Sequence, residues 1–507
     1  MLRVTLTPKG MSSRETEGHN LQTIEDPPPK RGTAIGLRKN AITLFGVVAT
    51  TCAFMGPATS IYFNTGLGVR SCGNAFGFAL LIAMVTMLLV AHVIAEFAKK
   101  IPTSGFGYTF SVQGLGPKAG FVVGWVLVGG YAMIGPMMLA AISYFLGQFC
   151  SNYLGLNINW AVFAVVIAGL TLFVSSRAIA MSVRVALIML VIEVVIMTLF
   201  FLTILLKGGA EGTTLAAFNP ANTLRPHDVD GIGDAVMWAI LMFVGFESAA
   251  TLGEETQDAK RNIPRALMLC VAGVGIFYML GAFAAVVGYG PGHVQKVVAS
   301  IDAGQNPWDP LLARFWGKGG SAMITLVIVN SIFANLLSGF NSVVRILYAM
   351  GRERVLPSFL GTVVPKTQVP LNAAIFYMSL SLAVTLVLGH RWNPMTVYMW
   401  SGTALGLAIV IVYMMVAVSL YCFYRRRPSE FNWLQHALLP ALAALVLCLP
   451  LRGVVASTLP SGGGIAPMTY IPYLGIAWVV LGSLYTGYLT RFKSELLLSM
   501  GKVFEGS

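Results

Sequence analysis

Apolar residues in this chain form long runs separated by short polar segments. Each run is close to the roughly 20 residues that a helix needs to cross a membrane. The pattern predicts an all-α integral membrane protein with twelve transmembrane helices and two longer connections, at about 207–232 and 289–319. The expected helices span about 41–63, 73–97, 119–148, 159–175, 182–206, 233–251, 264–288, 320–349, 371–389, 395–420, 435–450 and 469–490.

Two of these runs are interrupted at matching places, and each interruption begins with Phe-x-Gly and ends at a hydroxyl residue. Backbone that leaves a helix inside the membrane is costly unless it lines a cavity, so a matched pair indicates a binding site near the midplane. The alternative is two ordinary kinks, because Gly and Pro are common in membrane helices. The candidate binding residues are Phe54, Met55, Gly56, Pro57, Ala58, Thr59 and Ser60 in the first interruption, and Phe243, Val244, Gly245, Phe246, Glu247 and Ser248 in the second.

The spacing of the two interruptions predicts a repeated unit of five helices. Residues 41–206 form the first repeat and residues 233–420 the second, with opposite topology because five is odd. Two extra helices follow at 435–490. Residues 1–40 are polar and contain Pro27-Pro28-Pro29, which predicts a disordered cytoplasmic tail, and residues 491–507 form a second cytoplasmic tail.

Composition and charge narrow the class of protein. The chain is 56% hydrophobic and only 10% charged, which excludes a soluble domain. The net charge of +13 is that of many nucleic-acid binders, but about three quarters of the 33 Lys and Arg residues fall in alternate loops on the side of the N-terminus. This is the positive-inside distribution of a multi-pass protein of the cytoplasmic membrane with both termini cytoplasmic, and it argues against nucleic acid as a partner.

Motifs for catalysis, cofactors and metals are missing from the sequence. It contains no HExxH, GxSxG or P-loop motif, and its six cysteines have no metal-ligand spacing. A membrane enzyme is therefore disfavoured, and no cofactor or metal is expected. A channel does not need paired broken helices, and a receptor would usually add a soluble signalling domain.

Three blocks of sequence resemble the amino acid–polyamine–organocation permeases. They are Gly245–Ser248 with Glu254-Glu255 and Arg261–Ala266, then Ile101–Tyr108 leading to Gly124-Trp125, and Arg345–Arg352 followed by Leu356-Pro357. The resemblance implies a LeuT-like fold with discontinuous first and sixth helices. It also implies secondary active transport of amino acids or related amines. The chain departs from the family at Ala53–Pro57, where many members have a glycine-rich break, and at Phe106, where they have a second glycine.

A broken helix offers partners for both ends of an amino acid. The N–H groups of Ala58, Thr59 and Ser60 begin a half-helix whose positive dipole end favours a carboxylate. Carbonyl groups that end the preceding half, and those before Gly245, are placed to accept from an ammonium group. Pro57 lacks an N–H and fits the first turn. Phe243, Phe246 and Met55 are candidates for an apolar wall or gate, with core or lipid packing as the alternative.

Carboxylates inside the spans are candidates for proton coupling, because buried acids in a membrane are expensive. Glu193 is the leading candidate, since it lies near the middle of the fifth span, and Glu247 is the second. A packing role is the alternative for Glu193, and a bond to the unwound backbone for Glu247. The stretch Asn330–Asn335 has one serine and two amides, which argues weakly against a sodium site.

A cluster of charges at the inner end of the sixth span forms a predicted inner gate, with a solvated charge cluster as the alternative. Its members are Glu254, Glu255, Arg261 and Arg265. Together these patterns predict a proton-coupled amino acid permease, a symporter that works by alternating access. A polyamine or organic-amine importer or exchanger of the same family is the alternative. The expected partners are a small-molecule substrate, a proton and the lipid bilayer.

Overall fold

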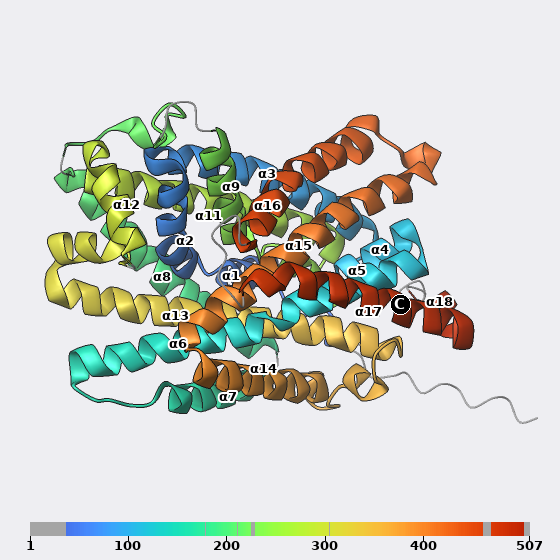
Figure 1. Cartoon of the computed structure of the whole chain (residues 1–507). Coiled ribbons are helices and arrows are strands. Elements are labelled where there is room, and N and C mark those ends of the chain that lie inside the picture. The colour runs from blue at the N-terminus through green and yellow to red at the C-terminus, as the bar shows by residue number, and fades with distance from the viewer. Residues whose placement is uncertain are drawn as a thin grey trace, which may run out of the picture. The chain divides into compact units, whose positions relative to one another are not determined.

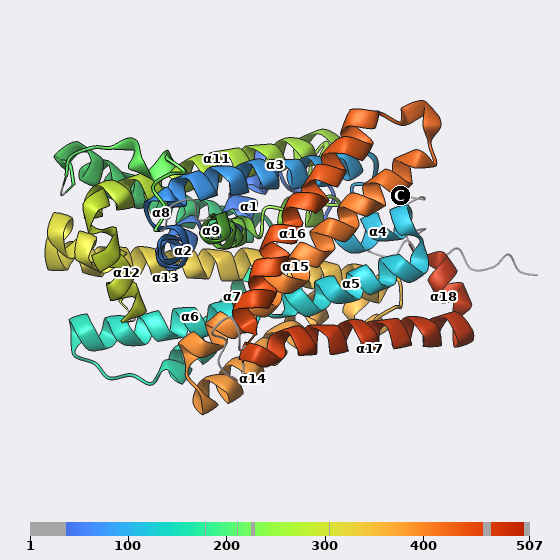
Figure 2. The same ribbon diagram turned by 45° about the horizontal axis from the view of Figure 1, so that its top comes forward.

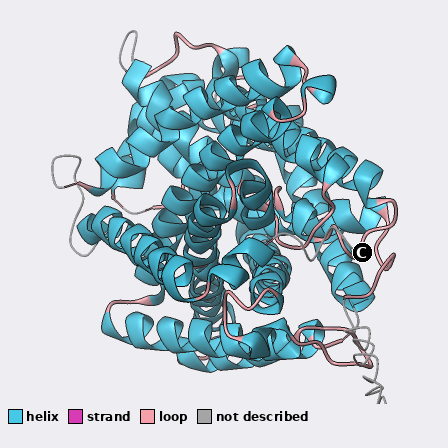
Figure 3. Ribbon diagram, turned by 90° about the vertical axis from the view of Figure 1, so that its right-hand side faces the viewer, coloured by secondary structure: helices cyan, strands magenta, loops and turns pink. Residues whose placement is uncertain are grey.

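The structure is a computed structural model that describes residues 37–177, 179–209, 211–224, 229–303, 305–459 and 468–500. These residues belong to one compact unit, Leu37–Ser507. They are almost entirely helical and contain no strand, only a single bridge between Ile42 and Thr256 (Figure 3). The all-α prediction is confirmed. Most of the expected N-terminal tail and residues 501–507 of the C-terminal tail lie outside the described residues.

Ten helical stretches of the described residues are long and apolar enough to cross a membrane. The first, Leu44–Lys100, contains three helices, α1 (Leu44–Met55), α2 (Pro57–Cys72) and α3 (Phe76–Lys100). A further apolar helix, α7 (Trp160–Ser175), is shorter, with 16 residues. The chain is therefore a multi-pass membrane protein, as its apolar runs predict.

The other apolar runs also become helices, most with bounds close to the expected ones. They are α5 (Pro117–Ala132), α6 (Ile134–Phe149), α8 (Ile179–Lys207), α9 (Val229–Phe243), α10 (Ser248–Thr251), α11 (Ala259–Tyr289), α13 (Trp308–Arg352), α14 (Leu371–Arg391), α15 (Pro394–Arg425), α16 (Leu439–Thr458) and α17 (Ile471–Phe492). Three shorter helices lie between or after them, α4 (Gly107–Leu115), α12 (Val294–Asp302) and α18 (Ser494–Ser499). The helix expected at 320–349 begins at Trp308 and has a kink at Gly317, and the helix expected at 435–450 ends at Thr458.

Both predicted interruptions are present. Helix α1 ends at Met55 because Gly56 adopts a left-handed conformation with φ of 54°, and Pro57 then begins α2. Helix α9 ends at Phe243, and Gly245, with φ of 114°, lies in the turn before α10. Glycine tolerates both conformations because it has no side chain.

The two breaks lie inside the helical body. Helix α1 packs against α8, α11 and α13, while α2 packs against α9 and α13. Helices α3 and α11 run along one another, as do α6 and α13 (Figures 1 and 2). In contrast, α7, α8 and α17 expose apolar side chains such as Val166, Leu199 and Leu474. A surface of this kind suits contact with lipid, so polar chemistry is confined to the interior.

Candidate functional site

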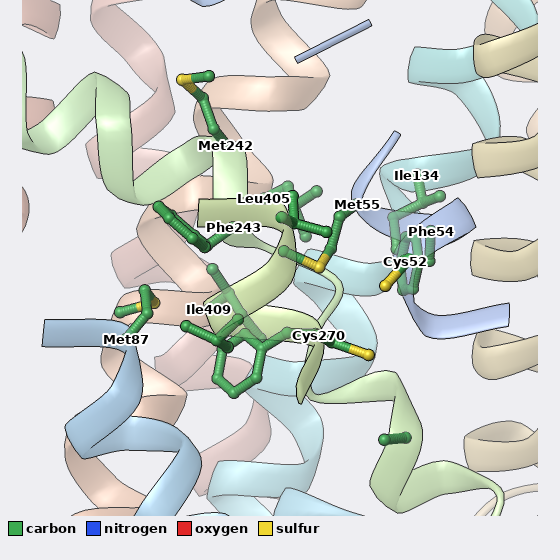
Figure 4. Close-up of a cluster of buried hydrophobic side chains, with 14 of the residues drawn as sticks. Cys52, Phe54, Met55, Met87, Ile134, Met242, Phe243, Cys270, Leu405 and Ile409 are labelled. Atoms are coloured by element: carbon green, nitrogen blue, oxygen red, sulfur yellow. The ribbon is translucent and has the colours of Figure 1, made fainter. Parts of the chain in front are cut away.

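A cavity of about 270 Å³ lies beside both breaks. It is lined by residues of α2, α6, α9, α13 and α15, and five of the predicted binding residues contribute to its wall: Phe54, Met55, Thr59, Ser60 and Val244. Figure 4 shows Phe54 and Met55 at the end of α1, with Phe243 and Leu405 nearby. The structure thus brings the two predicted interruptions to one cavity.

The remaining predicted binding residues are buried behind the wall of this cavity. They are Gly56, Pro57, Ala58, Phe243, Gly245, Phe246, Glu247 and Ser248. The two glycines permit close approaches. A Cβ atom on Gly56 would lie 2.8 Å from Nδ2 of Asn335, and one on Gly245 would lie 3.1 Å from the backbone carbon of Phe54. The breaks therefore contact each other through backbone.

The N–H groups at the start of α2 are occupied by protein groups. Ala58 N–H donates to Oε2 of Glu193 at 3.1 Å, Thr59 N–H donates to the Ser331 hydroxyl at 3.1 Å, and Ser60 N–H donates to the Gly56 carbonyl at 2.8 Å. These groups were expected to face a substrate carboxylate. Instead, a buried carboxylate from α8 lies at the positive end of the half-helix, which is electrostatically favourable.

At the second break, Glu247 is held on both of its oxygens. Oε1 accepts from the Tyr131 hydroxyl, and Oε2 accepts from the Tyr413 hydroxyl at 2.6 Å and from Gly245 N–H at 2.9 Å. Its side chain is completely buried. This is the bond to unwound backbone that was the alternative for Glu247, so here the carboxylate supports the turn.

Tyr278 of α11, which the sequence pattern did not single out, joins the two breaks. Its hydroxyl donates to the Met242 carbonyl at 2.8 Å and lies 3.5 Å from the Met55 carbonyl. The Met55 carbonyl also accepts from the Ser60 hydroxyl at 2.7 Å. Part of the carbonyl set expected to accept from an ammonium group is therefore already hydrogen bonded. A tyrosine in an apolar helix gives no signal of this role.

Ser331 and Asn335 of α13 are further site residues. They are four residues apart and so share one face of the helix. Ser331 caps α2, and Asn335 lines the cavity. Oδ1 of Asn335 is buried and accepts no hydrogen bond from the described residues. The sequence singled out this stretch only for its bearing on sodium. Its two polar side chains on one face of an apolar helix were the available signal.

A second, larger pocket of about 620 Å³ adjoins the cavity and shares Phe63, Leu67 and Met395 with it. The pocket lies toward the ends of α2, α6 and α13 that the charge distribution assigns to the outside. There the Tyr62 hydroxyl donates to Oδ1 of Asp309 at 2.9 Å. The two pockets are neighbours that share part of their lining.

Two ion pairs, of which one is buried, join the turn after α10 to the far end of α13. Nε of Arg345 lies 2.5 Å from Oε2 of Glu255, and both side chains are almost completely buried. Glu254 receives two hydrogen bonds from Arg352 at 3.0 Å each, and one from the Ser104 hydroxyl at 2.6 Å. Burial opposes ionisation of Glu254, but Arg352 and Ser104 outweigh it and hold the pKa of this carboxyl below its ordinary value.

The four charges expected to cluster do not lie together in the structure. Glu254 and Glu255 pair with arginines of α13, whereas Arg261 and Arg265 lie on an exposed face of α11. The error has a physical reason. The nearest arginines along the chain are four residues apart on one helix and point together to the surface. The fold brings the end of α13 against the acidic turn.

Comparison with known proteins gives the family. The family model for amino acid permeases matches residues 40–481, most of the chain. The low-affinity putrescine importer PlaP of Escherichia coli (strain K12) is 25% identical over 90% of this chain and 95% of its own length. The branched-chain amino acid permease BcaP of Bacillus subtilis (strain 168) is 24% identical, over 67% of this chain and 72% of its own. The aromatic amino acid transport protein AroP of Corynebacterium glutamicum is 23% identical, over 76% and 81%.

These matches confirm the resemblance drawn from the three sequence blocks and the expectation of a transporter rather than an enzyme. The family model covers the breaks, the cavity and both ion pairs in a single range, residues 40–481. The chain belongs to the amino acid permease family.

Proposed function

We propose that this protein is a secondary active transporter that moves a small solute with an ammonium group across the cytoplasmic membrane by alternating access. The observation that carries the proposal is a cavity at two broken helices that shares lining residues with a second pocket, while the ion pairs Glu255–Arg345 and Glu254–Arg352 lie toward the other end of α13. This is the arrangement of a site that is reached from one side at a time.

The proposed topology has twelve crossings with both termini cytoplasmic. Within Leu44–Lys100, α1 and α2 together form one crossing and α3 the next, while α7 adds a short crossing to the long apolar helices. Helices α1 to α8 then form one repeat, and α9 to α15 a second of opposite topology, in a LeuT-like arrangement with α16 and α17 outside it. The paired breaks after Met55 and Phe243 support this repeat.

Amino acids are the first candidate substrates, since the family and two of the relatives named above are amino acid permeases. An organic amine is the second candidate. It is favoured by the contact between Glu193 and Ala58 N–H and by the putrescine importer among the relatives. Both classes carry an ammonium group, but only the amino acids also carry a carboxylate.

Proton coupling through Glu193 is part of the proposal. The carboxylate touches the first break directly, so a change in its charge would change how α2 is held. Its second oxygen, Oε1, accepts no hydrogen bond from the described residues, although the Ser331 hydroxyl is a neighbour. Glu247, the second candidate, has both oxygens engaged and is less free to exchange a proton.

Proteoliposomes test the function directly. The purified protein should accumulate an amino acid or amine against its gradient when an inward proton gradient is imposed, and empty liposomes should not. Equal solute on both sides of the membrane at steady state, for every compound of a panel of amino acids and amines, would contradict active transport. Uptake that follows sodium and ignores pH would contradict proton coupling alone.

A further inference from the structure

We infer that the carboxylate of Glu193 occupies the place that a substrate carboxylate would take, so that the cavity selects amines that lack a carboxylate and carry an apolar body. The inference rests on the proposed transport function and names its substrate class. In this role Glu193 is a specificity-determining residue. Four observations carry the inference: the engaged N–H groups, the charges around the cavity, the free acceptors, and the apolar lining.

Backbone donors at both breaks are already used inside the protein. At the first break, the N–H groups of Ala58, Thr59 and Ser60 bond to Glu193, Ser331 and Gly56. At the second, those of Val244, Gly245, Phe246 and Ser248 bond to Leu241, Glu247, Phe243 and Gly245 in turn. A substrate carboxylate needs donors for its oxygens when it leaves water, and these backbone N–H groups could supply them only by giving up their present bonds.

The charges around the cavity also disfavour a second carboxylate. None of the described residues that line the cavity is charged, so no lysine or arginine there offers a partner. The positive end of α2, the usual anchor for an anion, already faces Glu193. A carboxylate added at the same end would compete with Glu193 for the Ala58 N–H.

Free acceptors at the first break fit an ammonium group instead. Oε1 of Glu193 and Oδ1 of Asn335 are both buried without a hydrogen-bond donor among the described residues. Both side chains are less than one tenth exposed; Asn335 lines the cavity beside Gly56, whereas Glu193 is outside the lining and contacts the break through Ala58 N–H. An ammonium group has three donors and no acceptor, so it satisfies such atoms, whereas a carboxylate does not.

The rest of the cavity is suited to an apolar body. Phe63, Trp238 and Tyr398 contribute aromatic surface. Methionines also line the cavity, and their side chains are flexible and polarisable and adapt to varied apolar shapes. A second charged group would find no charged partner among the described lining residues, so a solute with one amine and a hydrocarbon or aromatic body fits best. Six methionines line the cavity: Met55, Met137, Met138, Met395, Met399 and Met468.

Matched pairs of compounds test the inference on the full-length wild-type protein. Phenylalanine and phenethylamine share an amine and a phenyl body, and leucine and 3-methylbutylamine share an amine and a branched body. Each pair differs only in the carboxylate. We expect the amine of each pair to bind on the order of tenfold more tightly than the amino acid, by isothermal titration calorimetry of protein in nanodiscs. Equal or tighter binding of the amino acids overturns the inference.

Uptake of the same four compounds separates this inference from the proposed function. Accumulation of the amino acids but not the amines leaves active transport standing and overturns the selection by Glu193. If no compound binds or accumulates, both the inference and the proposed ammonium substrate are contradicted. Accumulation of the amines alone supports both.

Substitution of Glu193 sharpens the test. Glu193→Ala removes the carboxylate and leaves Ala58 N–H free, so amino acids should gain affinity relative to their amines and the tenfold preference should shrink or reverse. Glu193→Gln keeps an acceptor for Ala58 N–H but cannot ionise. It therefore distinguishes the effect of an occupied N–H group from the effect of a carboxylate charge. Glu211→Gln, at an exposed carboxylate that contacts His293, is the matched control and should leave the preference unchanged. An unchanged preference in Glu193→Ala protein that melts cooperatively would overturn the inference.

Discussion

At each break a buried carboxylate accepts a hydrogen bond from a backbone N–H, but the two carboxylates come from different parts of the chain. At the first, the acid that receives a backbone N–H is Glu193, which comes from α8 and lies 135 residues from its partner Ala58 in sequence. At the second, the acid is Glu247, which lies within the turn itself and receives Gly245 N–H. Both are completely buried, and each relieves backbone that has left its helix.

The carboxylates differ in how fully their oxygens are used. Glu247 receives two tyrosine hydroxyls and a backbone N–H, so neither oxygen is available to a solute. Glu193 receives one N–H and keeps Oε1 without a donor among the described residues. The comparison teaches that the second break is locked by an acid of its own turn together with tyrosines of α5 and α15. The first is held by a distant side chain that can exchange partners, and we expect coupling and selectivity to reside there.

Leucine at either break glycine should have the largest effect. Gly56→Leu and Gly245→Leu should abolish uptake. Their φ values of 54° and 114° are strained for any side chain, and an added Cβ atom would press on Asn335 or on the Phe54 backbone. Uptake and membrane insertion should be measured together, with Gly273→Leu on the open face of α11 as the control, because nothing lies within 4 Å of its Cβ position. Wild-type affinity in either break variant would show that the breaks are only kinks.

Glu247→Gln should lower stability more than any other conservative change at the breaks. The glutamine amide has one acceptor oxygen where the carboxylate has two. At least one of the three buried donors therefore loses its partner, at a cost on the order of 3 kcal/mol in the free energy of unfolding. Chemical denaturation in mild detergent measures the loss. Glu193→Gln, which keeps an acceptor for its single N–H donor, is the comparison and should cost less. A larger loss for Glu193→Gln would reverse the assignment of the locked break.

Glu193→Gln should change coupling more than stability. If Glu193 carries the proton, uptake by wild-type proteoliposomes should rise with an inward proton gradient, while uptake by the variant should be independent of it. The measurement needs imposed pH gradients with and without sodium. Full pH-driven uptake by the variant would place the coupling group elsewhere.

Glu254 lies outside the breaks and gives the smallest expected effect. Because Arg352 and Ser104 hold its pKa below the ordinary value, ionised Glu254 stabilises the folded protein at pH values above that ordinary value, and this contribution is lost as the pH falls through the folded-state pKa. At pH 7, Glu254→Gln should cost on the order of 1 kcal/mol, since the pair is partly exposed.

Thermal unfolding of wild type and Glu254→Gln at pH 7, 4.5 and 3.5 tests this sign. The difference between the two proteins should be largest at pH 7 and should shrink as the medium becomes more acidic. Arg261→Ala, at an exposed arginine that does not pair with Glu254, should leave the unfolding temperature of the wild type unchanged at each of these pH values. A difference that grows toward low pH would contradict the assigned ion pair.

Local pattern was enough for the helices and their breaks. A run of apolar residues must become a helix in a membrane, where backbone groups have no water to bond with, and so most of the expected spans reappear with similar bounds. Gly56 followed by Pro57 ends one helix and begins the next through backbone preferences of the two residues themselves. The bond from Glu247 to its own turn spans two residues and was weighed from the sequence as an alternative.

Contacts between distant helices were decided only by the tertiary structure. Glu193 was singled out as a buried acid, but nothing in its neighbourhood along the chain names Ala58 as its partner. The sequence groups the two acids with the nearby Arg261 and Arg265, while the fold pairs Glu255 with Arg345, 90 residues away. The physical reason is the same in both cases. A buried charge takes whichever complementary group packing brings within hydrogen-bond reach, and packing order is a property of the assembled helices rather than of any one segment.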